Sequence, residues 1–127
     1  MIQPYWNAYF PPFPVLDMEI ATPMETDWIG PFTMFVDSGA DITIIPETFL
    51  EDLELPIERT ARIRSQWRAG PTVTIYRADV RIANLIFPGV RIAGDPLGRD
   101  AVLGRDILNF LDIRLDGPAK QLHLLTR

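Results

Sequence analysis

The sequence predicts a mostly β protein folded as a single domain. The chain has 127 residues, which is the usual size of one domain. Its apolar runs are short, rich in β-branched residues and separated by clusters of glycine, proline and aspartate, as expected for strands joined by turns. Hydrophobic residues make up 47% of the chain and charged residues 23%, a balance typical of a folded globular protein rather than a disordered one.

The first fourteen residues have a composition of their own, with five aromatic residues and four of the chain's 12 prolines. Because proline fixes φ and lacks a backbone donor, we expect residues 1–14 to form an extended or irregular arm and residues 15–127 to form the domain. The aromatic side chains of the arm require burial. Either this domain or a second subunit can provide it, and the sequence leaves both possibilities open.

Short strands are predicted along most of the domain. Val15–Ala21 and Trp28–Val36 are apolar segments on either side of a turn at residues 23–27. Ile42–Ile45 is β-branched throughout, which indicates a buried strand. The remaining predicted strands are Arg59–Arg68, Thr72–Ile82, Leu85–Ala93, Ala101–Leu103, Asp112–Leu115 and Gln121–Leu125.

Two short helices are predicted between these strands. The first spans Glu47–Leu55, because Pro46 suits a first helical turn and apolar side chains at three of the following positions share one face. The second lies near the C-terminus, where Asp106 is placed to cap a helix that ends at residue 110 or 111.

The composition excludes several classes of function. The chain contains no cysteine, which removes disulfides, thiolate nucleophiles and Cys-ligated zinc. His123 is the only histidine, so a multi-histidine metal site is not expected. The formal net charge of −5 argues against a nucleic-acid partner. No apolar run approaches the roughly 20 residues of a membrane span and no signal peptide is visible, so we expect a cytoplasmic protein without a membrane partner.

The tripeptide Asp37-Ser38-Gly39 lies between two apolar strands. A carboxylate on a tight loop that is held at both ends has a fixed direction, and the glycine lets the backbone turn sharply and approach a ligand closely. A single tripeptide of this kind is most often an ordinary turn. A second motif, Val102–Leu108, follows later in the chain, and the two together are much more specific than either one alone.

Residues Phe35–Ile45 together with Val102–Leu108 resemble the retropepsins, the retroviral-type aspartic peptidases, and are most similar to cellular and bacterial members of that family. The resemblance extends over residues 15–125. It implies a closed retropepsin-like β-barrel with one short C-terminal helix and a flap hairpin. It also implies a homodimeric endopeptidase that acts on extended polypeptides. Each subunit would supply one catalytic Asp37, and the pair would activate a water molecule without metal, cofactor or covalent intermediate.

The length of the chain agrees with a homodimer independently of the resemblance. A two-lobed aspartic peptidase needs two such loops and over twice this length, whereas this chain has one Asp-Ser-Gly tripeptide. The second carboxylate must therefore come from another copy. Two aspartates about 3 Å apart share one proton, because like charges at that distance cannot both ionise cheaply. The expected result is a bell-shaped activity profile on the acidic side of neutrality.

The resemblance also implies roles for the residues around the aspartate. Asp37, Ser38 and Gly39 would form the catalytic motif, with the serine hydroxyl joining the two loops across the dimer axis. The backbone at Gly39 and Asp41 would hold extended substrate, and Arg105 would form an ion pair with Asp41 that braces the loop against the helix. Candidates for lining substrate subsites are Ala40, Ile42, Val102 and, with core packing as an equal alternative, Ile44 and Leu103.

The hairpin over residues 62–74 corresponds to the flap that closes over substrate in retropepsins. We predict its bend at Ala69-Gly70-Pro71 and take Trp67 and Gly70 as positions that contact substrate. Retroviral flap tips are rich in glycine, whereas this one has a single glycine and a bulky tryptophan, so a purely structural hairpin is an equal alternative. A restricted flap also leaves open a rival function, a dimerisation or peptide-binding module with little or no hydrolysis.

The chain ends complete the resemblance, because the ends of retropepsins interleave into a sheet across the dimer. Gln121–Leu125 suits that role, since its apolar residues and edge groups need a partner. The N-terminal arm suits it less, because its prolines cannot donate hydrogen bonds. The aromatic residues of the arm would instead cross the subunit interface or occupy the cleft as an inhibitory segment.

Overall fold

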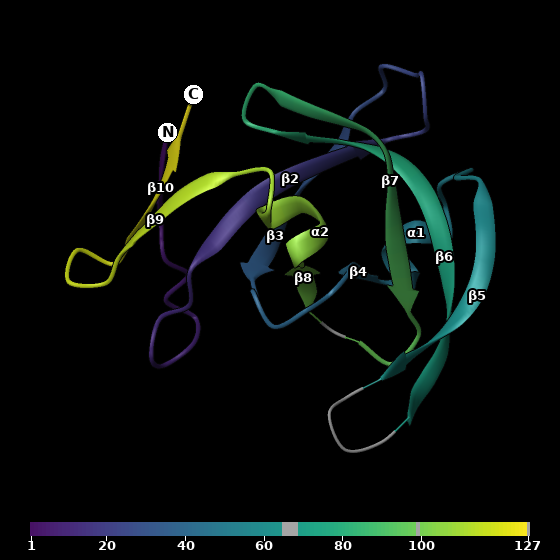
Figure 1. Ribbon diagram of the computed structural model, residues 1–127, viewed down its shortest axis with the longest axis horizontal. Helices are drawn as coiled ribbons and strands as arrows, with labels where there is room; N and C mark the ends of the chain where they lie inside the picture. The colour runs from purple at the N-terminus through teal and green to yellow at the C-terminus, as the bar shows by residue number, and fades with distance from the viewer. Residues whose placement is uncertain (65–68, 99, 127) are drawn as a thin grey trace.

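Ten strands and two short helices make up the part of the chain described by the structure, which is residues 1–64, 69–98 and 100–126 of a computed structural model (Figure 1). The strands are β1 (Ile2–Pro4), β2 (Val15–Ala21), β3 (Ile29–Val36), β4 (Thr43–Pro46), β5 (Ile57–Arg64), β6 (Ala69–Ile82), β7 (Leu85–Asp95), β8 (Ala101–Leu103), β9 (Asp112–Asp116) and β10 (Gln121–Leu125). The helices are α1 (Glu47–Leu50) and α2 (Arg105–Leu108).

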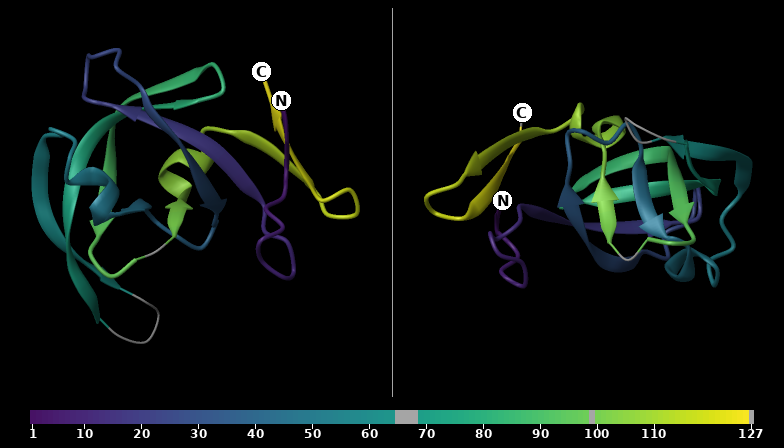
Figure 2. Two further views of the ribbon diagram at one scale, coloured as in Figure 1. Left: turned by 180° about the vertical axis from the view of Figure 1, so that it is seen from behind. Right: turned by 90° about the horizontal axis from the view of Figure 1, so that it is seen from below.

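Six of the strands close into a barrel, which confirms the predicted fold class. The main sheet runs in the order β2-β3-β8-β4-β7-β6-β5, and a further pairing of β2 with β6 closes the ring, leaving β5 on the outer side of β6 (Figure 1, Figure 2). Strand β8 lies between β3 and β4, parallel to the first and antiparallel to the second. The loop that joins β3 to β4 must therefore pass over the end of β8.

Aliphatic side chains that alternate along the strands fill the barrel. On β2, for example, Leu16, Met18 and Ile20 are fully buried, whereas Asp17 between them is exposed. This alternation is the two-residue period of a strand with one face on a core. Burying each such side chain stabilises the fold by roughly 1.5–3 kcal/mol, so the barrel is a rigid support for the loops at its ends.

Helix α1 is shorter than predicted, since it ends at Leu50 rather than Leu55. Leu50 is fully buried and anchors the helix to the core. After it, the N–H of Leu53 bonds to the carbonyl oxygen of Leu50, which is a tighter turn than that of an α-helix. Pro56 follows and disfavours a helical conformation at the residue before it, which explains why the pattern does not continue.

The bend of the long β5–β6 hairpin does not lie where it was predicted. Strand β6 already begins at Ala69, so Gly70 and Pro71 are strand residues, at a register shift opposite the end of β5. A proline is tolerated there because a bulge contains a position without a ladder hydrogen bond. Residues 65–68, which include the predicted substrate contact Trp67, lie outside the described part of the chain.

The two chain ends form a separate three-stranded sheet in the order β1-β10-β9, which projects from the barrel (Figure 2). The expectation that the arm is poorly suited to sheet pairing is wrong for β1. Met1 exchanges backbone hydrogen bonds with Leu124, and the N–H of Tyr5 donates to Lys120. Along an edge strand, the backbone N–H groups point alternately to the neighbouring strand and to the open edge. The nitrogen of Pro4 points to the open edge, so its missing N–H costs no hydrogen bond within the sheet.

No helix in residues 1–64, 69–98 and 100–126 is both long and apolar enough to cross a membrane.

Candidate active site

Asp37, Ser38 and Gly39 lie exposed at the surface of the loop between β3 and β4. The backbone N–H of Asp37 donates to the carbonyl oxygen of Leu103 on β8 (3.1 Å), and the N–H of Gly39 donates to Oδ1 of Asp37 (2.9 Å). A Cβ at Gly39 would crowd the same oxygen at 3.1 Å. Oδ2 of Asp37 has no hydrogen-bond partner among the described residues. The loop thus presents one carboxylate in a fixed direction.

Arg105, the first residue of α2, holds this loop in place. Its guanidinium group donates to the carbonyl oxygen of Ser38 (2.9 Å) and forms an ion pair with Asp41, and its backbone N–H donates to Ala40 (2.8 Å). The side chain of Asp41 is 86% exposed, so the ion pair itself contributes only roughly 0–1 kcal/mol. Its main effect is to fix the position of the loop relative to the helix.

A buried polar link joins the two motifs, and the sequence did not predict it. Among the described residues, Thr43 is the polar one that is fully buried. Its hydroxyl donates to Oδ1 of Asp106 (2.8 Å) and accepts from the N–H of Gly104 (3.2 Å), while its own N–H donates to Oδ2 of Asp106 (3.1 Å). The prediction of Asp106 as a helix cap is therefore wrong. Gly104 occupies the N-cap, and Asp106 lies in the first turn facing Thr43.

The signal for this link was present in the sequence. Thr43 carries a single hydroxyl in an otherwise aliphatic buried strand, and such a group must find a hydrogen-bond partner. The sequence does not show which residue is that partner, because Asp106 lies 63 residues away in the chain.

Thr43→Val is expected to lower the free energy of unfolding by about 1–3 kcal/mol, because it keeps the shape of the side chain but removes the hydroxyl that accepts from the buried N–H of Gly104 and donates to Asp106. Urea unfolding monitored by fluorescence measures the effect. Thr43→Ser, which keeps the hydroxyl, is the matched control and should lose less. A valine variant as stable as the wild type would show that the link contributes nothing.

A small cavity of about 180 Å³ opens beside Asp37. Its walls come from the barrel and from the N-terminal arm, and its lining residues are Tyr9, Phe13, Phe35, Asp37, Asp100 and Val102. The hydroxyl of Tyr9 donates to Oδ1 of Asp100 (3.0 Å), and this hydrogen bond holds the pKa of Tyr9 above its usual value. The arm is therefore part of the surface around the aspartate.

The arm reaches this position as a small hairpin packed on its own domain. Trp6 and Phe13 exchange backbone hydrogen bonds of 2.8 and 3.0 Å. Both rings pack against Phe35, with centroid separations of 5.3 and 4.6 Å, and Tyr9 adds a third contact at 5.2 Å. Phe10, near the tip of the hairpin, is 98% exposed. The aromatic content of the arm was a visible signal, but its docking on Phe35 was not.

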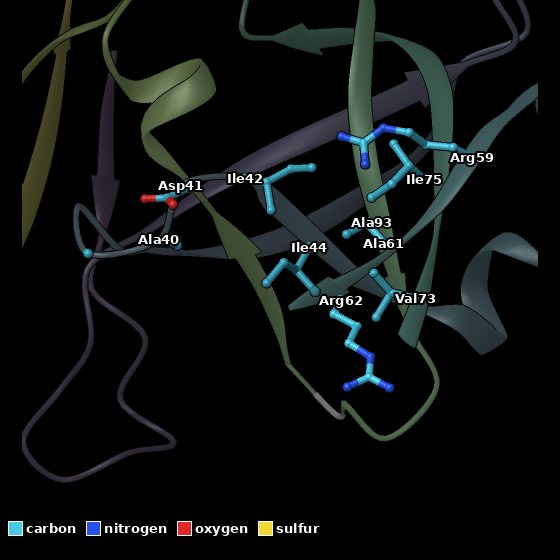
Figure 3. A pocket seen from close by; sticks show the side chains of 11 residues that line it. Ala40, Asp41, Ile42, Ile44, Arg59, Ala61, Arg62, Val73, Ile75 and Ala93 are labelled. Atoms are coloured by element: carbon cyan, nitrogen blue, oxygen red, sulfur yellow. The ribbon is translucent and has the colours of Figure 1, made fainter. Parts of the chain in front are cut away.

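A larger cavity of about 490 Å³ lies between the Asp37 loop and strands β5, β6 and β7 (Figure 3). Of the predicted substrate-binding residues, Ala40, Asp41 and Ile42 line it, and Val102 lines the small cavity instead. Gly70 is absent from the lining of both.

Ile44 and Leu103 were each predicted to belong either to the core or to a substrate subsite, and the structure places them differently. Leu103 is fully buried in the main core, whereas Ile44 lines the larger cavity. Within the described residues, no group of three His, Cys, Asp or Glu side chains is placed to hold a metal ion.

The protein is a closed six-stranded barrel, and its Asp-Ser-Gly loop crosses the end of β8. This is the architecture of the retropepsin-like aspartic proteases. Sequence comparison then identifies the family. The chain belongs to the family described as gag-polyprotein putative aspartyl protease, which matches residues 29–110. The resemblance predicted from the two motifs is confirmed.

The fold is shared with solved structures, among them two that match most of this chain. The retroviral protease-like domain of Ddi1 from Leishmania major has a TM-score of 0.51 and 17% identity, over 90% of this chain and 90% of that chain. A retropepsin-like aspartic protease from Rickettsia conorii has a TM-score of 0.52 and 17% identity, over 86% of this chain and 93% of that chain. At these identities the likeness shows the fold alone. None of the curated proteins compared with the chain matches it in sequence.

Proposed function

We propose that the protein is an aspartic endopeptidase that works as a homodimer, with one Asp37 from each copy. The observation that carries this proposal is the single Asp37 carboxylate, exposed on a loop that Arg105 and the Thr43–Asp106 link hold rigid. One carboxylate cannot accept the proton of the water and donate a proton to the carbonyl oxygen in the same step. A second copy that meets the first at this exposed loop supplies the other group.

The reaction follows from two carboxylates that share one proton. The ionised carboxylate accepts a proton from a water molecule, whose oxygen attacks the carbonyl carbon of the scissile peptide bond. The protonated carboxylate donates its proton to the carbonyl oxygen. When the intermediate collapses, the carboxylate left ionised takes the proton of one hydroxyl group, the C–N bond breaks, and the other aspartate gives its proton to the departing amine. Holding the water and the peptide in place is the role of the rigid loop.

The sheet of chain ends supports the dimer. Strand β10 is central and paired on both sides, so the open edges belong to β1 and β9. Ile2 and Leu115 on these outer strands are about half exposed. The Nε2 atom of His123, on β10, is buried without a hydrogen-bond partner among the described residues. Open strand edges with exposed apolar side chains are surfaces on which a second copy can add.

The small cavity supports cleavage next to apolar residues. Phe13, Phe35 and Val102 give it apolar walls directly beside Asp37. A substrate side chain placed there is desolvated while its peptide bond lies at the aspartate. The intact pair of motifs supports the enzyme over a binding module without hydrolysis. The cytoplasmic location expected from the sequence stays a prediction.

The proposal is tested by hydrolysis of a library of unstructured peptides across the acidic to neutral range, together with sedimentation of the same samples. We expect cleavage beside apolar residues, a bell-shaped pH profile with its maximum below neutrality, and a dimer at assay concentrations. A protein that remains monomeric and yet cleaves peptides would contradict the shared site. A dimer that cleaves no peptide at any pH would contradict the peptidase.

A further inference from the structure

Two arginine side chains line the larger cavity and have no carboxylate partner within the described part of the chain. Among the described residues, Arg77, Arg81, Arg91, Arg105 and Arg114 all form ion pairs. Arg59 and Arg62, here called the cavity arginines, form no ion pair with the side chains that the structure describes. Both belong to β5 and both line the larger cavity.

The acidic residues near the cavity arginines are already engaged. Glu58 precedes Arg59 on β5, at a register shift between β5 and β6, and it does not line the cavity. Glu58 lies 2.7 Å from Arg77 and 2.6 Å from Arg91, and the hydrogen bonds from Arg91 and then Arg77 lower its pKa. Asp41 does line the cavity, but it forms the ion pair with Arg105. As far as the described side chains show, the two positive charges in the cavity therefore have no carboxylate partner.

The surface between the cavity arginines is apolar. Val73, Ile75 and Ala93 are buried there, and Ile42 and Ile44 pack against them. Figure 3 shows the two guanidinium groups at opposite ends of this apolar row. An extended peptide that fits the cavity would place an aliphatic side chain on the row and carboxylates near its ends.

We propose that the cavity arginines select substrates that carry aspartate or glutamate beside the aliphatic residue bound in this cavity. The inference rests on the proposed peptidase function and adds the charge of the substrate to it. The chain as a whole has a formal net charge of −5, so an acidic peptide is repelled by most of the molecule. The cavity arginines are the local groups that reverse this repulsion at the cleft.

The test measures binding of fluorescent peptides to the Asp37→Asn variant, which should hydrolyse them too slowly to disturb the measurement. The peptides form two series, and every peptide has an apolar centre. One series carries glutamate at successive positions beside this centre, and the other carries glutamine at the same positions. The measurement is made at about pH 6, above the ordinary carboxyl pKa of about 4. We expect the glutamate peptides to bind about 3- to 30-fold more tightly, with a preference that declines as salt is raised.

Two double variants decide whether the cavity arginines cause the preference for glutamate. Replacing both arginines by glutamine (Arg59→Gln with Arg62→Gln) should abolish the preference. Replacing both by lysine (Arg59→Lys with Arg62→Lys) keeps the charge and should keep most of the preference. Arg81→Gln, in the barrel wall and absent from the lining of the larger cavity, is the matched control and should leave the preference unchanged. Equal binding of both series, or a preference that survives the glutamine variants, would overturn this inference and leave the peptidase standing. Failure of every peptide to bind would overturn both proposals.

Discussion

Asp37→Asn is expected to lower kcat/KM for peptide hydrolysis by about 10²- to 10⁴-fold, since the amide can neither accept the proton of the water nor share one with its counterpart. The amide oxygen can still accept the 2.9 Å hydrogen bond from the N–H of Gly39, so the loop should keep its shape. Asp37 is exposed in the single chain, and its replacement should leave the thermal unfolding midpoint nearly unchanged. Steady-state kinetics and thermal unfolding of the same samples check both expectations.

Mixing the variant with the wild type tests whether two copies share one site. With a roughly tenfold excess of variant and free exchange of subunits, nearly every wild-type chain pairs with a variant chain, and activity per wild-type chain should fall about tenfold. If each chain carried a complete site, activity per wild-type chain would not change. Asp17→Asn is a matched control, because that aspartate is exposed on β2 in the barrel wall and should have no effect in the same mixture.

The strands were largely predictable because their signals are local. Val15–Ala21, Ala101–Leu103 and Gln121–Leu125 have the predicted bounds, since alternation or an apolar run flanked by turn residues decides them. The hairpin bend was misplaced because Gly70 and Pro71 are typical turn residues that here occupy a bulge. In such a case the pairing of neighbouring strands overrides the local preference.

The site was predictable only in part, for the same reason. The aspartate motif and Arg105 stand in recognisable stretches of sequence. The Thr43–Asp106 link and the Tyr9–Asp100 hydrogen bond connect residues that are 63 and 91 positions apart. No periodicity or turn preference specifies such contacts, because they exist only once β8 has entered between β3 and β4 and the arm has docked on the barrel.

Gly104→Ala is expected to be the most destabilising small substitution in the site. The φ of Gly104 is −91°, a conformation open to any residue, so backbone freedom is not the reason for glycine. The reason is space. An added Cβ would lie 2.7 Å from the carbonyl carbon and oxygen of Ile42 and 3.1 Å from the carbonyl oxygen of Ala40. These are backbone atoms of the aspartate loop, which cannot rotate away as the end of a long side chain can.

The two motifs would therefore have to move apart, and the 3.2 Å hydrogen bond from the N–H of Gly104 to Thr43 would lengthen. Overpacking of this kind costs about 1–3 kcal/mol, and strain against backbone should place Gly104→Ala at the upper end. Gly117→Ala is the matched control, because a Cβ there meets nothing within 4 Å, and its free energy of unfolding should stay within about 0.5 kcal/mol of wild type. Urea unfolding of both variants separates the outcomes. Equal stability of the two would mean that the contact between the motifs is looser than the structure describes, and the rigid aspartate loop on which the proposed chemistry depends would lose its support.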